Sequence, residues 1–146
     1  MLAQKYNISV NIDAEEANRL ELSLDLIEKL LDEPELKDYK GIGFVVQSYS
    51  KRCPYVLDYL INLAREKQHY LMIRLVKGAY WDSEIKWAQT DGLDDFPLFT
   101  RKNHTDIAYV ACAKNCWRRR MSFTLSLLLI TFSQCAPFMN SDKEKI

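Results

Sequence analysis

Glycine, proline and histidine are scarce in this sequence, whose 146 residues include four Gly, four Pro and two His. So little glycine and proline excludes a collagen-like or low-complexity chain. An excess of one charge is also lacking, because 20 Lys and Arg residues balance 20 Asp and Glu residues. The net charge therefore gives no reason to expect nucleic-acid binding. The length and the 48% hydrophobic content are typical of one average globular domain.

Metal-binding cysteine motifs are absent as well. No two of the four cysteines, Cys53, Cys112, Cys116 and Cys135, form a CxxC pair, and only two histidines are present to complete a site. Cys112 and Cys116 are four residues apart, a spacing that places them on one face of a helix. We therefore expect no metal site, and we interpret the cysteines as partly buried, reduced thiols of a cytosolic protein.

Neither a signal sequence nor a membrane span is expected. The N-terminus has no apolar core, and the apolar run at 121–132 is internal and shorter than the roughly 20 residues that cross a bilayer. The neutral total charge combines two unlike segments. Residues 1–116 contain 15 basic and 18 acidic residues, a net charge of −3, whereas residues 117–146 contain 5 and 2, a net charge of +3.

Short apolar runs predict three strands, and amphipathic stretches between them predict helices. The expected strands occupy residues 7–12, 41–47 and 70–76. The expected helices occupy residues 13–31, 54–64, 82–89 and 103–116. Asp13 stands where an N-cap belongs, Pro34 stops the first helix, and Pro54 opens the second.

Strand–helix units recur about every 30 residues, which predicts a parallel βαβ architecture. Right-handed crossovers allow either a doubly wound sheet or part of a (β/α)8 barrel. No GxGxxG motif follows any strand, so the dinucleotide-binding fingerprint is absent and the partial barrel is favoured. A complete barrel typically needs about 250 residues, more than this chain has.

Polar residues stand at or near the carboxyl end of each expected strand. Asp13 ends the first strand, Gln47 ends the second, Arg74 interrupts the third and Lys77 closes it. In both α/β architectures, ligands bind at the carboxyl ends of the strands. An acid, an amide and two cations at this edge suit an anionic or electron-rich ligand.

Each of these residues also has a simpler interpretation. Asp13 fits a helix N-cap, Gln47 a solvated loop residue, and Arg74 one half of a structural ion pair. Arg74 and Lys77 with Gly78 suit a small anion site, since glycine allows close backbone approach. The neighbouring aromatic residues, Tyr80 and Trp81, offer a platform for a ring system, although such residues more often pack in a core.

The segments NIDAEEANRLELSLDLIEKL, GIGFVVQSYSKRCPYVLDYLINLA and LMIRLVKGAYWDSEIK resemble the proline dehydrogenase domain of bifunctional bacterial proline-utilisation proteins. The resemblance extends from about Leu2 to Asn115, and RLVKGAYW is long and specific. It implies a partial (β/α)8 barrel, in the α/β class, with about three to four βα units. It also implies FAD as cofactor and oxidation of L-proline to pyrroline-5-carboxylate, with hydride passing from proline C5 to flavin N5 and electrons passing to a quinone.

The resemblance assigns roles to residues at the strand ends. It implies that Asp13 helps to hold the proline ammonium and a partner lysine, that Arg74 lies near flavin N5, and that Tyr80 packs on proline. The residues implied to bind FAD are Gln47, Arg74, Lys77, Gly78, Ala79, Trp81, Thr100 and Arg101. No nucleic-acid contact is implied. The implied location is cytoplasmic and, for the full-length family, peripheral to the inner membrane, where quinone is reached.

The chain also departs from the family pattern. A lysine from an earlier strand and an arginine pair from the last barrel helix have no counterpart here. We expect residues 1–115 to be a fragment of the barrel and residues 116–146 to be an unrelated tail that is disordered or poorly packed. A complementary barrel fragment would be a further partner.

A change of reading frame explains the tail. The DNA that encodes CWRRRMSFTLSLLLITFSQCAPFM can spell LLAAQDVIYPQFATHNVQSVRPIY in a neighbouring frame, and that string resembles the next segment of the family. We therefore hypothesise out-of-frame translation after about residue 115. Two alternatives to an active enzyme stay open: an inactive remnant of a disrupted gene, and an interaction module that acts through the basic, apolar tail.

Overall fold

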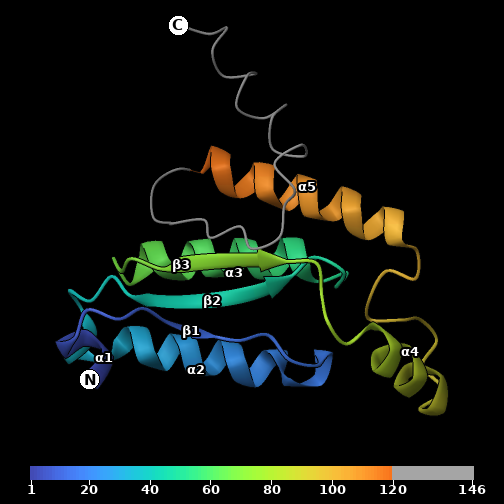
Figure 1. Cartoon of the computed structure of the whole chain (residues 1–146), viewed down its shortest axis with the longest axis horizontal. Coiled ribbons are helices and arrows are strands. Elements are labelled where there is room, and N and C mark those ends of the chain that lie inside the picture. Colours follow the sequence, from blue (N-terminus) through green and yellow to red (C-terminus); the bar gives the residue numbers. More distant parts are fainter. Residues whose placement is uncertain (120–146) are drawn as a thin grey trace, which may run out of the picture.

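The computed structural model describes residues 1–119, which form a three-stranded parallel sheet in the order β1-β2-β3. The strands are β1 (Val10–Ile12), β2 (Ile42–Gln47) and β3 (Met72–Val76). The α-helices are α1 (Leu2–Lys5), α2 (Leu20–Asp32), α3 (Cys53–Glu66), α4 (Trp81–Thr90) and α5 (Lys102–Arg118). Two short 3-10 helices, η1 (Ala17–Arg19) and η2 (Pro34–Leu36), flank α2. The carboxyl ends of β2 and β3 point toward α4, and α1 lies near the other end of the sheet (Figure 1).

The core lies between the sheet and the helices α2, α3 and α5. Alternate residues of the strands face this core, because successive side chains of a strand point to opposite faces. Phe44 on the central strand is only 1% exposed. The strand residues of the core are Ile42, Phe44, Val46, Ile73 and Leu75. Burying each such side chain contributes about 1.5–3 kcal/mol, so this layer is the main source of stability.

Most of the expected elements are confirmed, with ends that shift by a few residues. The third helix, α3, has proline in its first turn, as expected from Pro54. Its predicted apolar stripe is buried, and consists of Val56, Leu57, Leu60, Ile61 and Ala64. The expected strands at 41–47 and 70–76 form β2 and β3.

The helix after β1 starts later than expected, and the N-cap interpretation of Asp13 is wrong. The α-helix α2 begins at Leu20, after an extended Glu16 and the turn η1. Residues 13–16 therefore form a loop, which side chains from distant elements hold in place. Pro34 does follow the end of this helix at Asp32, as expected.

The amino end of the sheet is closed by contacts from buried side chains to backbone carbonyls. Both ring nitrogens of the buried His69 lie 2.8 Å from carbonyl oxygens, Nε2 from Leu36 and Nδ1 from Tyr70. The hydroxyl of Tyr39 donates to the carbonyl of Ile8. A Cβ at Gly41 would lie 2.5 Å from the ring of Tyr39, so the glycine lets this ring pack closely.

Three cysteines are buried between α3 and α5 and are reduced. Cys53 Sγ donates to Cys112 Sγ at 3.5 Å, and this hydrogen bond together with burial raises the pKa of Cys53. Burial raises the pKa of Cys116 to about 11. Within residues 1–119, no group of three or more His, Cys, Asp or Glu residues is placed to bind a metal ion. Cys135 lies outside the described residues.

The helices within residues 1–119 are not built to cross a membrane, since none of them is both long and apolar enough to span one. The apolar run at 121–132 lies outside this part of the chain.

Candidate functional site

The carboxyl ends of the strands bring Asp13 and Arg74 together. Arg74 is paired in register with Val45 on β2, and its neighbours Ile73 and Leu75 face the helices, so Arg74 faces the opposite side of the sheet. Arg74 Nη2 donates to Asp13 Oδ1 at 2.6 Å, with the arginine side chain 27% and the aspartate side chain 73% exposed. Arg74 thus forms an ion pair, one of the two interpretations left open by its sequence, and the pair lies at the strand ends.

The guanidinium of Arg74 retains an unused donor. Its Nε is buried and has no hydrogen-bond partner among the described residues. A buried N–H without a partner costs free energy, and functional sites are a common place for one. Asp13 also has spare capacity, because Arg74 and the backbone N–H of Ala14 both bond its Oδ1.

Gln47 joins two loops at this edge, so its interpretation as a solvated loop residue is wrong. Its Nε2 donates to the carbonyl of Glu15 at 2.7 Å, and its Oε1 accepts from the backbone N–H of Ala79 at 3.2 Å. The amide therefore fixes the spacing between the loop after β1 and the loop after β3. In this arrangement both ends of the amide are engaged within the protein.

Lys77 points toward α5. Its Nζ lies 2.7 Å from Asp106 Oδ1, and Lys102 Nζ lies 2.7 Å from Asp106 Oδ2. Hydrogen bonds from Lys102 and Lys77 lower the pKa of Asp106. Arg74 and Lys77 therefore each have a carboxylate partner of their own, and the structure does not place them together on one anion.

Gly78 is in a backbone conformation that favours glycine, with φ of +137°. A Cβ at this position would lie 2.5 Å from the ring of Tyr49, which is buried beneath it. The backbone N–H of Tyr49 donates to the carbonyl of Lys77 at 2.8 Å, which ties the two loops together. Burial, followed by the charge of Glu84, raises the pKa of Tyr49, so the phenol stays neutral. Gly78 and Ala79 themselves are exposed.

The aromatic residues after Gly78 lead into α4. Tyr80 is half-buried and precedes the helix, and its carbonyl accepts from the backbone N–H of Glu84 at 3.0 Å. Trp81 is 42% exposed, so it is a surface residue rather than a core residue. Its Nε1 donates to the carbonyl of Phe99 at 3.1 Å, which places Trp81 near Thr100. Thr100 is exposed, and Arg101 is exposed at the N-terminus of α5.

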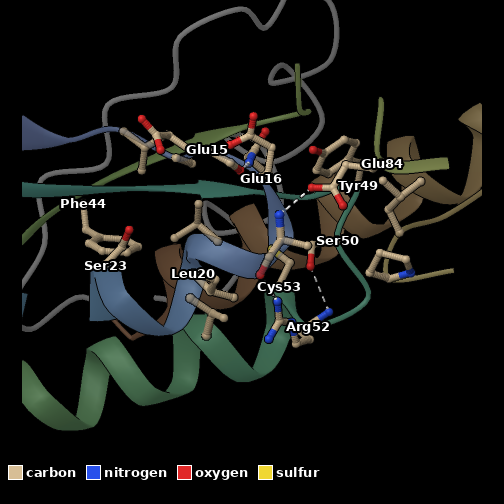
Figure 2. Close-up of a pocket in the computed structure, with 18 residues that line it drawn as sticks. Glu15, Glu16, Leu20, Ser23, Phe44, Tyr49, Ser50, Arg52, Cys53 and Glu84 are labelled. Carbon is tan, nitrogen blue, oxygen red and sulfur yellow. Dashed lines mark hydrogen bonds between the residues drawn. The ribbon is translucent and has the colours of Figure 1, made fainter. Parts of the chain in front are cut away.

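The loop that carries Asp13 is held by two residues that the sequence did not single out. The backbone N–H of Ala17 donates to Glu84 Oε1 at 2.5 Å. The backbone carbonyl of Ala17 accepts from Arg52 Nη2, also at 2.5 Å. Figure 2 shows Glu84 reaching this loop beside Tyr49, with the hydrogen bond drawn as a dashed line. No sequence signal identifies Glu84, because an acid in the first turns of a helix is ordinary.

A cleft lies against residues 14–17 of this segment. Glu16, Tyr49, Arg52 and Glu84 are among the residues that line it (Figure 2). Apart from Gln47, the predicted ligand-binding residues do not line this cleft within the described part of the chain.

A family model described as "Proline dehydrogenase" matches residues 1–129. The bifunctional protein PutA of Klebsiella aerogenes is 65% identical over 114 residues, which cover 78% of this chain and 9% of that protein. The PutA of Rhizobium meliloti is 60% identical over 121 residues, which cover 80% of this chain and 10% of that protein. This chain therefore spans about a tenth of the length of the curated relatives that it matches.

Solved structures of PutA show the same fold. The PutA of Bradyrhizobium japonicum superposes with a TM-score of 0.83 and 50% identity, over 86% of this chain and 13% of its own. The PutA of Bdellovibrio bacteriovorus inactivated by N-propargylglycine superposes with a TM-score of 0.89 and 30% identity, over 99% of this chain and 15% of its own. The expected fold class, an α/β partial (β/α)8 barrel, is confirmed by these matches and the parallel sheet.

Proposed function

The chain belongs to the proline dehydrogenase family, and we propose that it supplies part of an FAD-dependent site that oxidises L-proline to pyrroline-5-carboxylate. The observation that carries this proposal is the Arg74–Asp13 pair at the carboxyl ends of the strands. In α/β barrels this edge of the sheet is where ligands bind.

The residues at this edge fit a flavin. The buried Arg74 Nε, without a partner among the described residues, suits an electron-rich ring atom. Gly78 is exposed and has no side chain, so a ligand can approach its backbone closely. The exposed ring of Trp81 offers a surface for an aromatic ring. The residues that we propose to hold FAD are Gln47, Arg74, Lys77, Gly78, Ala79, Trp81, Thr100 and Arg101.

We assign the substrate-side roles to three residues. When bound, FAD supplies the two-electron oxidation, with flavin N5 accepting hydride from proline C5. Asp13 holds the proline ammonium through Oδ2, since Oδ1 already accepts from Arg74 and the Ala14 N–H. Arg74 provides a fixed positive charge where negative charge develops during the reaction. Tyr80 packs on the substrate from the start of α4.

The wider partners follow from the same proposal. The final electron acceptor is a quinone, reached from the cytoplasmic side at the inner membrane surface. Within residues 1–119 the sheet has β1 and β3 as its two edges, and unpaired strand edges readily accept further strands. These edges suit a complementary barrel fragment as a partner.

The same open edges favour the second candidate, an inactive remnant that holds no FAD. Purified chain mixed with FAD separates the two candidates. If the chain is an enzyme, we expect a bound-flavin absorbance band at about 450 nm and proline-dependent dye reduction. Both signals should be weaker in Arg74→Met. Free FAD that washes away completely, with no dye reduction, would overturn it for this chain. Adding a complementary barrel fragment then tests whether the edges restore the site.

The tail carries two further proposals, both on residues whose larger part lies outside the described residues. We propose that translation continues out of frame after about residue 115, within the segment that the family model matches, which runs to residue 129. Sequencing the gene across the Asn115 codon tests this, because a single-base change should restore the PQFATHN string. We also keep the interaction-module alternative, for which deletion of residues 117–146 should abolish binding to lipid vesicles or a partner.

A further inference from the structure

Glu84 is the one acidic residue among residues 1–119 that is buried, with 5% of its surface exposed. A carboxylate in such a place needs hydrogen-bond partners, because an unpaired buried charge is costly. The partner here is the backbone N–H of Ala17, 2.5 Å from Oε1. The contact joins residues 67 positions apart in the sequence, so it is a specific tertiary tie rather than local helix capping.

The tie joins the two segments that carry the proposed substrate contacts. Ala17 lies four residues after Asp13, at the start of η1, where the loop after β1 ends. On the other side, the backbone N–H of Glu84 donates to the carbonyl of Tyr80 at 3.0 Å, one turn earlier in the chain. Glu84 therefore holds the Asp13 loop with its carboxylate and the Tyr80 carbonyl with its backbone.

Other contacts of the loop do not replace this one. Arg52 binds the carbonyl of Ala17 from the position just before α3, which has no part in the Tyr80 segment. Gln47 connects Glu15 to Ala79, but it is half-buried and belongs to the proposed flavin site itself. Glu84 is a buried connection, and Figure 2 shows it next to Tyr49 with its hydrogen bond drawn.

We propose that Glu84 is a positioning residue that sets the place of Asp13 relative to Tyr80, and thereby the affinity for L-proline. This inference rests on the proposed function. It is the acceptor oxygen that acts, because the partner is a neutral backbone N–H. Loss of the tie should therefore raise KM for proline more than it lowers kcat, since the ligand-binding groups remain present but are no longer held together.

Three variants of the full chain test the tie, and a fourth variant serves as the control. Glu84→Ala removes the acceptor, Glu84→Gln keeps an oxygen acceptor without the charge, and Ala17→Pro removes the N–H donor from the loop side. Ala17 begins η1, a position where proline is tolerated, so this third variant keeps the test open if Glu84→Ala does not fold. Glu16→Ala is the matched control, because the Glu16 carboxylate lies on the same loop and pairs with the nearby Arg19.

Hydrogen–deuterium exchange of residues 14–19 is the readout that needs no activity. We expect exchange to rise about tenfold in Glu84→Ala and Ala17→Pro, and to stay within about threefold of wild type in Glu84→Gln and Glu16→Ala. Where the wild-type chain, alone or with a complementary fragment, oxidises proline, KM should rise about tenfold in the first two variants with a smaller change in kcat.

The outcomes separate this inference from the proposed function. Unchanged exchange in both Glu84→Ala and Ala17→Pro overturns the tie, and so does a Glu84→Gln variant that exchanges as fast as Glu84→Ala. Faster exchange with an unchanged KM shows a purely structural contact and overturns the positioning role. If the wild-type chain does not oxidise proline, either alone or with a complementary barrel fragment, the result counts against the proposed function. The exchange result still decides whether the contact between Glu84 and Ala17 exists.

Discussion

The two ends of the sheet are built differently. At the amino end, the buried side chains of His69 and Tyr39 bond backbone carbonyls. At the carboxyl end, partly exposed ion pairs hold Arg74 and Lys77, and Arg74 Nε has no partner within the described residues. The contacts at the amino end tie buried side chains to the backbone and serve stability. The carboxyl end retains Arg74 Nε, a buried donor unpaired among the described residues, and the second carboxylate oxygen of Asp13, at the edge where barrels bind ligands.

Two glycines make the difference concrete. Gly41 at the amino end and Gly78 at the carboxyl end each lie against a tyrosine ring, at 2.5 Å from where a Cβ would stand. Gly78 alone of the two has a positive φ, and it is exposed. Each glycine thus lies over a buried tyrosine ring, but only Gly78 does so in an exposed loop. Four substitutions test this contrast.

The largest effect on stability is expected from His69→Ala at the amino end. The substitution removes the imidazole N–H donor from between two backbone carbonyls and opens a cavity, at a cost of about 3 kcal/mol. Urea denaturation measures this loss. Flavin affinity of the remaining folded protein should be unchanged, and a specific loss of flavin affinity would break the distinction between the two ends.

Arg74→Met should lower activity strongly and stability only slightly, the reverse of His69→Ala. Removing the guanidinium from the strand ends should lower proline-dependent dye reduction by about a hundredfold, since it removes a donor aimed at developing charge. The unfolding free energy should fall by less than about 1 kcal/mol, because its partner Asp13 is mostly exposed and stays hydrated. Steady-state kinetics and urea denaturation are compared on the same preparation. A stability loss matching that of His69→Ala would contradict the prediction.

Gly78→Ala should weaken flavin binding about tenfold. An alanine is strained at φ of +137°, at about 1–2 kcal/mol, and its Cβ meets the Tyr49 ring. Flavin titration followed by absorbance measures the effect. Gly92→Ala is the matched control, because Gly92 also has a positive φ, of +63°, but no neighbour within 4 Å. Equal losses of flavin affinity in both variants would show that strain alone, and not the loop over Tyr49, explains the result.

The smallest effect is expected at Asp106 and depends on pH. Hydrogen bonds from Lys102 and Lys77 lower the pKa of the folded-state carboxyl. A lowered pKa stabilises the fold above the ordinary aspartate value of about 4, and this stabilisation is lost as pH falls through the lowered value. Asp106→Asn should therefore have a lower urea midpoint than wild type at pH 7, and the two midpoints should converge in acid. A constant difference across this range would contradict the assignment.

Much of the fold was predictable because its signals are local. The apolar run of β2, the stripe of α3 and the prolines near helix ends depend on neighbouring residues, and all are confirmed. The start of α2 was not predictable in this way. Asp13 has the sequence context of an N-cap, but contacts from Gln47, Arg74 and Glu84 hold its loop extended. Local propensity is outweighed where distant side chains supply the backbone's hydrogen bonds.

The candidate site divides in the same way. The polar residues at the strand ends could be identified from the sequence, since a charge within an apolar strand needs an interaction partner. Their partners could not, because Arg74 meets Asp13 across 61 positions and Gln47 meets Glu15 across 32. Glu84 carries no signal at all in the sequence, and only its burial against Ala17 distinguishes it.

The sequence by itself determined the order of strands and helices, the family, and the residue types at the carboxyl edge, because each is written in local patterns and motifs. Only the tertiary structure decided which donor meets which acceptor there, and that Arg74 Nε is left with none among the described residues. The physical reason is that pairing depends on distances between elements, which the packing of the sheet against α2, α3 and α5 fixes.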